Sequence, residues 1–130
     1  MIAAGIGCRR GAPASDIEAA IHAALLRGRI NADALDVIAT IDAKSAEAGI
    51  RAVAEKLGAT FIVVPERELA AASMRVKTHS ERVSTLIGVG SVAEAAALAA
   101  AGSESKLVVP RIIVGAATCA LAASAAEPVP

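Results

Sequence analysis

Apolar residues follow two patterns along this chain. Continuously apolar runs of strand length begin at Ile2 and recur at residues 35–41 and 61–64, and Pro65 closes the last of them. Between these runs, residues 17–25 and about 46–57 carry apolar positions spaced three and four apart, which predicts helices with one buried face. Strands and helices in this order indicate right-handed βαβ crossovers, and continuously apolar strands are typical of a parallel sheet covered on both faces.

The ends of these helices have recognisable signals. Ser15 and Glu18 have the spacing of a capping box at the start of the first helix. Gly28 and Gly58 stand where the first and second helices are expected to end, because glycine readily adopts the left-handed conformation of a helix C-terminus. The pattern thus predicts two short helices with defined ends.

The middle of the chain is predicted to be less regular. A short helix is expected over residues 66–72, and residues 73–90 mix charge with few apolar anchors. Such a long irregular stretch inside a compact domain is usually functional or mobile. Within it, Ser80 could cap a short helix that ends near Leu86. A clearer helix follows, with Ser91 and Glu94 as its capping box and Gly102 at its end.

The last part of the chain predicts an antiparallel hairpin. Residues 107–110 and 116–121 are β-prone, and Gly115 lies near the turn between them. Pro110 has no N–H for a ladder hydrogen bond, so we place it on an edge strand or at a bulge. The predicted fold is therefore a single three-layer α/β domain spanning residues 1–126. Its mostly parallel sheet is flanked by helices and carries a C-terminal antiparallel hairpin or edge strand, and residues 127–130 form a tail.

Composition narrows the functional classes. The chain has 130 residues, 55% of them hydrophobic, but Phe61 is its one aromatic residue. Proteins that bind single-stranded nucleic acid stack bases on several aromatic side chains, and a single phenylalanine cannot supply such a platform. Lys and Arg total 13, as do Asp and Glu, so no overall field attracts nucleic acid or anionic lipid. An anionic ligand would have to be recruited locally.

The two cysteines, Cys8 and Cys119, show neither a disulfide framework nor the spacing of a metal site. We expect free thiols in a reducing cytoplasm. No signal peptide is apparent, because the positive charges follow the first apolar run. The longest uncharged run, residues 112–126, is shorter than a membrane helix requires. The sequence thus predicts a cytoplasmic protein with no membrane partner, no metal and no cofactor.

The first candidate site is the stretch that contains Gly5, Gly7, Cys8, Arg9 and Arg10. It is predicted as a glycine-rich loop between a strand and a helix N-terminus, where open α/β proteins hold ligands and where backbone amides attract anions. The guanidiniums can bind carboxylates or phosphates bidentately, and beside them the pKa of the thiol could fall below its ordinary value. No dinucleotide or Walker A motif is complete. The alternative is a tight turn with two solvated arginines.

The second candidate site is the end of the strand at residues 35–41, where Asp42 and Lys44 follow Thr40. Because both strands are predicted to be parallel, this loop should lie beside the first one. Asp42 and Lys44 could then act as an acid–base pair or a polar clamp. The alternative is a helix cap at Asp42 or Ser45 with Lys44 facing solvent.

The third candidate is a second glycine-rich approach to a helix N-terminus, formed by Gly88, Gly90 and Ser91 with Glu94 in the first turn. It also suits an anion. A well-capped helix after a flexible loop explains the same residues. His79 and Ser80 lie in the preceding segment without a persuasive catalytic partner.

Four segments, taken together, resemble the CobE / CbiG C-terminal-domain family of cobalamin biosynthesis. They are Gly5-Ile6-Gly7-Cys8-Arg9-Arg10-Gly11, Ala39-Thr40-Ile41-Asp42-Ala43-Lys44, Ser80-Glu81-Arg82-Val83, and Gly88-Val89-Gly90-Ser91-Val92-Ala93-Glu94-Ala95-Ala96-Ala97-Leu98. The closing Thr118-Cys119-Ala120-Leu121-Ala122 strand also fits. The family often has proline where this chain has Gly90.

The resemblance implies a compact α/β protein that acts in corrin ring construction. In CbiG proteins the module follows another domain, and the whole protein opens the δ-lactone of cobalt-precorrin-5A with loss of acetaldehyde. Here it is expected to stand alone, as in CobE, which favours a precorrin-binding, carrier or accessory protein. The alternative is a hydrolase that uses Asp42, Lys44 or Cys8. The expected partners are a tetrapyrrole intermediate and other pathway enzymes, with the protein a monomer or homodimer.

Overall fold

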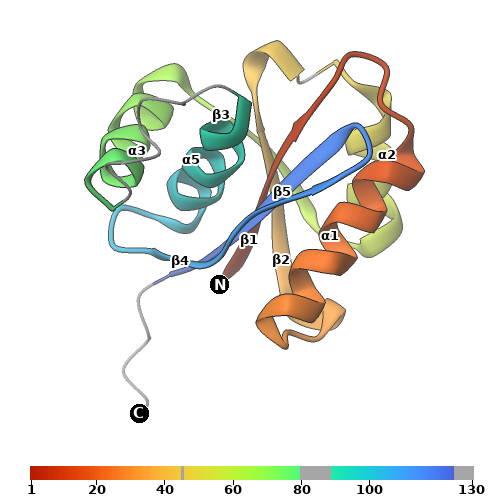
Figure 1. Cartoon of the computed structure of the whole chain (residues 1–130), viewed down its shortest axis with the longest axis horizontal. Coiled ribbons are helices and arrows are strands. Elements are labelled where there is room, and N and C mark those ends of the chain that lie inside the picture. Colours follow the sequence, from red (N-terminus) through yellow and green to blue (C-terminus); the bar gives the residue numbers. More distant parts are fainter. Residues whose placement is uncertain (45, 80–88, 125–130) are drawn as a thin grey trace.

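The computed structural model describes residues 1–44, 46–79 and 89–124 as one sheet with helices on both faces (Figure 1). The strands are β1 (Ile2–Cys8), β2 (Leu35–Ile41), β3 (Thr60–Val64), β4 (Lys106–Val114) and β5 (Ala117–Ala123). The helices are α1 (Ala14–Gly28), α2 (Ala48–Leu57), α3 (Glu66–His79) and α5 (Val89–Ala101), with short 3-10 turns at Ala32–Ala34 and Asp42–Lys44. The three-layer α/β architecture predicted from the sequence is confirmed.

The prediction of a mostly parallel sheet is wrong, because the sheet is mixed. The strand order is β3-β2-β1-β5-β4. In the described part of the chain, β1 with β2 and β2 with β3 are parallel, whereas β5 is antiparallel to both β1 and β4. The hairpin therefore joins the sheet through its second strand, which lies beside β1.

The C-terminal hairpin itself is confirmed. Gly115 adopts a φ of +57° in the turn between β4 and β5, a left-handed conformation that favours glycine. Pro110 lies in β4, an edge strand, within the stretch where the register shifts between Val109 and Ile112. A missing N–H is tolerated at an edge or bulge, which explains the proline there.

Helices α1 and α2 cover one face of the sheet, and α3 and α5 cover the other (Figure 1). Side chains alternate along β1, so Ala4, Ile6 and Cys8 pack toward α1 and α2. Ala3 packs toward α5, whose buried side is built almost entirely from alanine. Small residues permit close approach between helix and sheet, and this explains the alanine-rich composition.

The closest approach occurs at Gly5. A Cβ atom there would lie 2.0 Å from the carbonyl oxygen of Ala93 and 2.5 Å from the backbone nitrogen of Ala97. The backbone of α5 therefore rests directly on β1, and Gly5 is needed for packing.

The capping box predicted at the start of α1 is wrong. Helix α1 already begins at Ala14, with Pro13 at its N-cap and no side-chain cap. Glu18 instead accepts a hydrogen bond from Lys56 Nζ of α2 (3.0 Å), which also holds the pKa of the Glu18 carboxyl below its usual value. At the other end, Arg29 takes the left-handed conformation predicted for Gly28.

Helix α3 is longer than predicted. It continues through residues 73–79, which were expected to be irregular, and the predicted short helix from Ser80 lies outside the described residues. Helix α5 begins at Val89, two residues before the expected cap at Ser91. The endings at Gly58 and Gly102 are as predicted, and both glycines have positive φ.

Candidate functional site

The loops that follow β1 and β2 lie side by side at one edge of the sheet, as the parallel arrangement predicts. The backbone N–H of Gly11 donates to Glu47 Oε1 at 2.9 Å and joins the two loops. Gly49, in the first turn of α2, is so close to the first loop that a Cβ atom would lie 3.0 Å from the Ala12 carbonyl oxygen. These contacts fix the relative position of the two loops.

The N-terminal half of α5 is directed toward the same edge. Glu94, in the second turn of α5, accepts a hydrogen bond at Oε2 from the backbone N–H of Arg111, past the middle of β4 (3.1 Å), whereas the C-terminal end of α5 lies near the start of β4. Helix α5 is therefore antiparallel to β4. The N-termini of α1, α2 and α5 thus surround the ends of β1 and β2, and their amides give this edge a positive potential.

Cys8 lies in the last position of β1, in contact with the core beneath α1 and α2, and its side chain is buried. Burial raises the pKa of the Cys8 thiol, the Glu47 carboxylate raises it further, and the Lys44 ammonium acts in the opposite direction. The prediction that its surroundings lower this pKa is therefore wrong. At neutral pH Cys8 is a protonated thiol.

The charged residues of the prediction lie at the same edge of the sheet as Cys8. Arg9 and Arg10 follow it and are exposed, and the backbone N–H of Arg9 donates to the Ala116 carbonyl oxygen at 2.9 Å. Asp42 is exposed and Lys44 is half-buried, both in the 3-10 turn after β2. The structure thus brings Cys8, both arginines and the Asp42 turn to the same edge.

Gly5, Gly7 and Thr40 lie within strands and not in the loops. The Thr40 hydroxyl is fully buried and donates to the Ile6 carbonyl oxygen at 3.0 Å. From β5, the Thr118 hydroxyl donates to the Gly7 carbonyl oxygen at 3.2 Å. The two hydroxyls hold the end of β1 from both sides, so Thr40 supports the site from below.

Of the third candidate group, Gly88 lies outside the described residues. Gly90 and Ser91 lie in the first turn of α5, and the Glu94 carboxylate is occupied by the backbone of β4. This group therefore contributes the start of a helix to the edge.

Glu47 and Thr118 were not predicted as site residues. Glu47 is the N-cap residue of α2. Its carboxylate joins the two loops by accepting a hydrogen bond from Gly11, which lies 36 positions away in the sequence. Thr118 was noted only as part of a strand. Hydrophobic spacing places strands and helices but carries no signal for a contact between two loops.

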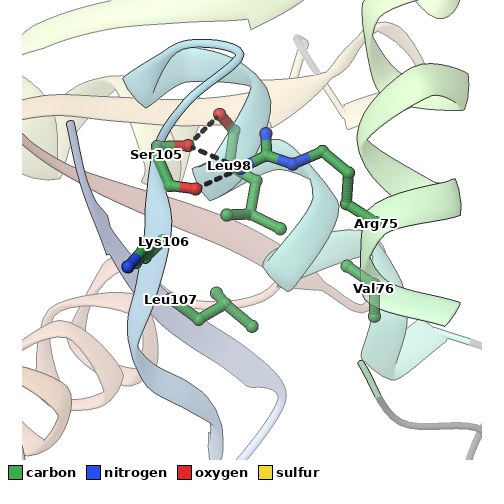
Figure 2. Close-up of a pocket in the computed structure, with 6 residues that line it drawn as sticks. All are labelled: Arg75, Val76, Leu98, Ser105, Lys106 and Leu107. Atoms are coloured by element: carbon green, nitrogen blue, oxygen red, sulfur yellow. Dashed lines mark hydrogen bonds between the residues drawn. The ribbon is translucent and has the colours of Figure 1, made fainter. Parts of the chain in front are cut away.

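A second feature lies between α3, α5 and the start of β4. A cavity of about 460 Å³ is lined by Arg75, Val76, Leu98, Ser105, Lys106 and Leu107 (Figure 2). A smaller space of about 280 Å³ lies between α3 and α5, and Arg75 borders both. No residue of this cavity was singled out from the sequence.

The residues that the structure describes contain no group of three or more His, Cys, Asp and Glu side chains able to hold a metal ion. Nor does any helix among them have the length and apolar character needed to cross a membrane.

Comparison with known proteins gives a consistent result. A family model described as "Cobalamin synthesis G C-terminus" matches residues 2–122. "Protein CobE" from Sinorhizobium sp is 35% identical over 121 residues, which cover 93% of this chain and 79% of that protein. "Cobalt-precorrin-5A hydrolase" from Priestia megaterium is 30% identical over 105 residues, but they cover only 28% of that protein's length.

Solved structures agree with these matches. Cobalamin biosynthesis protein chiG from Agrobacterium tumefaciens has a TM-score of 0.78 and 38% identity, over 97% of this chain and all of that one. The crystal structure of CobE, described as a protein from the cobalamin (vitamin B12) biosynthetic pathway, has a TM-score of 0.79 and 32% identity over 94% of this chain and 92% of that one.

Proposed function

The chain belongs to the cobalamin synthesis G C-terminal family, and from this premise we propose that it binds a corrin-ring intermediate as a carrier or accessory protein. The broader assignment, a cobalamin biosynthesis protein, follows from the family. The proposal concerns what the protein does in that pathway.

One observation carries the proposal: Arg9, Arg10 and Lys44 come from two loops that a hydrogen bond joins at one edge of the sheet. Corrin intermediates bear many acetate and propionate carboxylates. Guanidiniums bind carboxylates bidentately, and the surrounding helix N-termini favour the same sign of ligand. The chain is neutral overall and the Asp42 and Glu47 carboxylates lie at the same edge, so the individual cations, and not a net positive charge, are what would select a polycarboxylate.

The test is a spectrophotometric titration of the purified protein with hydrogenobyrinic acid. We expect a saturable change in the absorption spectrum of the macrocycle. The fully esterified compound serves as the control, because it keeps the ring and removes the charges that the arginines would bind. Equal binding of the ester, or no spectral change with the free acid, would refute the proposal.

A hydrolase is the second candidate, and one arrangement favours it. The Asp42–Lys44 turn lies beside the buried Cys8, and a relative bears the name of a cobalt-precorrin-5A hydrolase. On this alternative, Asp42 and Lys44 would assist attack of water on a lactone carbonyl. The raised pKa of Cys8 lowers the fraction of thiolate at neutral pH, which argues against Cys8 as the nucleophile.

Incubation with a lactone-bearing intermediate, followed by mass spectrometry, separates the two functions. The opened lactone appears as a mass change in the hydrolase case. An unchanged substrate that still co-purifies with the protein indicates a carrier. If turnover does occur, loss of it in Asp42→Ala and retention in Cys8→Ala would assign the role to the turn after β2.

A further inference from the structure

We propose that the cavity between α3, α5 and β4 is a second binding site, which takes a small amphipathic carboxylate. The site does not depend on the corrin-binding proposal. It lies near the start of β4, where Lys106 pairs with Ala123, which in turn pairs with Ile2. The other end of β1, at Cys8, is about 20 Å away along the strand.

The size and walls of the cavity suit a small organic molecule. Its volume of about 460 Å³ falls within the usual range for small-molecule sites. Val76 and Leu98 are 6% and 4% exposed, and with the half-buried Leu107 they form apolar walls. In Figure 2 these three side chains surround the space beneath the Arg75 guanidinium, whereas Lys106 extends away from it.

Arg75 supplies the polar end of the cavity. Its Nη1 donates to the Gly102 carbonyl oxygen at 3.2 Å, and its Nη2 donates to the Ser105 carbonyl oxygen and approaches Ser105 Oγ at 3.4 Å. These acceptors hold the guanidinium in one orientation. A guanidinium has five N–H groups, more than these three acceptors use, so it can still donate to a ligand.

The partner that fixes Arg75 is itself rigid. Ser105 is 3% exposed, and its hydroxyl group lies 2.9 Å from the Leu98 carbonyl oxygen and 2.7 Å from that of Gly102. A fixed cation above apolar walls favours a ligand with one anionic group and a hydrocarbon body. A guanidinium matches the planar geometry of a carboxylate. A corrin macrocycle is too large for a cavity of this volume.

The experiment uses octanoate as the probe and the methyl resonances of the intact protein as the readout. We expect saturable shifts of the Val76, Leu98 and Leu107 methyl groups at millimolar octanoate. Octanamide has the same chain without the charge, and it should bind at least about tenfold more weakly, as loss of a charge-assisted hydrogen bond implies. No saturable shift at these methyl groups, or equal affinity for the two probes, would overturn the site.

Two pairs of variants test the residues. Arg75→Met should weaken octanoate binding at least about tenfold, whereas Arg67→Met, an exposed arginine on the same helix, should not. If Arg75→Met fails to fold, Leu107→Trp decides the question, because it fills the cavity and keeps the guanidinium. Val108→Trp is its control, since Val108 is 42% exposed and does not line the cavity. Octanoate binding that survives Leu107→Trp in the folded protein contradicts the proposal.

Discussion

Cys8 marks the point at which β1 meets the candidate site, and its protonation depends on burial and on two charged neighbours. Burial and the Glu47 carboxylate raise the pKa of the thiol, and Lys44 opposes them. The folded protein holds this proton more tightly than the unfolded chain, so the protonated thiol contributes to the free energy of unfolding. That contribution is fully present below the pKa of the unfolded thiol, about 8.5. It is lost as the pH rises through the raised value.

The first prediction follows from these neighbours. Alkylation of Cys8 by iodoacetamide should be slow at neutral pH and should accelerate only above the pH at which a free cysteine reacts. Glu47→Gln keeps an oxygen for the Gly11 N–H but removes the charge, so it should lower the pH midpoint of alkylation. Lys44→Met should raise it. Peptide mass spectrometry measures the rates and separates Cys8 from Cys119, which is fully buried and should stay unmodified in the native protein.

Gly5 carries the second prediction, which concerns packing. Gly5→Ala would place its Cβ atom 2.0 Å from the Ala93 carbonyl oxygen, so α5 must move away from β1. Overpacking of this kind costs about 1–3 kcal/mol or more. Urea unfolding should show a loss in that range or above. Gly58→Ala is the control, because its Cβ atom meets nothing and only the left-handed conformation is penalised, by about 1–2 kcal/mol. A smaller loss for Gly5→Ala than for Gly58→Ala would contradict this account.

At the scale of single residues, the sequence predicts where the candidate residues lie better than it predicts what each of them does. The ends of two parallel strands must meet, so Cys8 and Asp42 could be placed at one edge from hydrophobic spacing alone. Gly5 was assigned to a ligand-binding loop because a glycine needed for helix packing and one needed for a loop look alike in sequence. The direction of the Cys8 pKa shift depends on burial and on Glu47, which spacing does not reveal.

Among the secondary-structure elements, α5 depends most on its C-terminal end. The Ser105 hydroxyl lies within hydrogen-bond distance of the carbonyl oxygens of Leu98 and Gly102, and Arg75 of α3 donates to the same turn. Carbonyl groups at a helix end need such partners, and cations are favoured there by the helix dipole. The turn at residues 102–105 therefore links α3, α5 and β4 through hydrogen bonds.

The third prediction tests that turn. Ser105→Ala removes a buried hydroxyl and should lower the free energy of unfolding by about 1–3 kcal/mol. Ser103→Ala, two residues earlier and exposed, should change it by less than about 0.5 kcal/mol. Thermal or urea unfolding of the two variants provides the comparison. Equal stability of both would show that the serine contacts do not support α5.

The limits of each element were harder to predict than its existence. Residues 73–79 mix charge with few apolar anchors, which predicts irregular structure, yet Val76 is buried and Arg75 donates to the loop after α5. Likewise, Ser15 and Glu18 have capping-box spacing, but Pro13 is the N-cap, so the helix begins two residues earlier than that spacing implies. Tertiary partners of this kind override local signals.

At the scale of the whole molecule, the order of strands could not be read from the chain. A βαβαβ pattern defines β1, β2 and β3, but a hairpin can join either edge of a parallel sheet and through either of its strands. Here β5 can lie in the middle of the sheet beside β1, because the residues of β5 are small or apolar on both faces of the sheet. All of them except Ala123 are buried. The outer strand β4 then contains Pro110 and most of the hairpin's exposed residues, both of which are tolerated at the edge of a sheet.

The last prediction concerns how charge is distributed over the molecule. Thirteen cationic and thirteen acidic side chains cancel, so attraction of a polycarboxylate should depend on where the arginines lie and not on how many there are. Arg9→Gln with Arg10→Gln should weaken binding of hydrogenobyrinic acid by at least about tenfold at low salt, the effect expected for losing charge-assisted hydrogen bonds. It should also reduce the dependence of affinity on salt concentration, because exposed charges are screened.

The matched control changes the net charge equally at the opposite end of α1. Arg27→Gln with Arg29→Gln removes two exposed arginines near the C-terminus of that helix, far along it from the loop after β1. Affinity and salt dependence should stay close to those of the unaltered protein. If both double variants weaken binding alike, net charge alone governs it and the paired loops at the sheet edge have no special role. If only the first does, recognition resides where the ends of β1 and β2 meet.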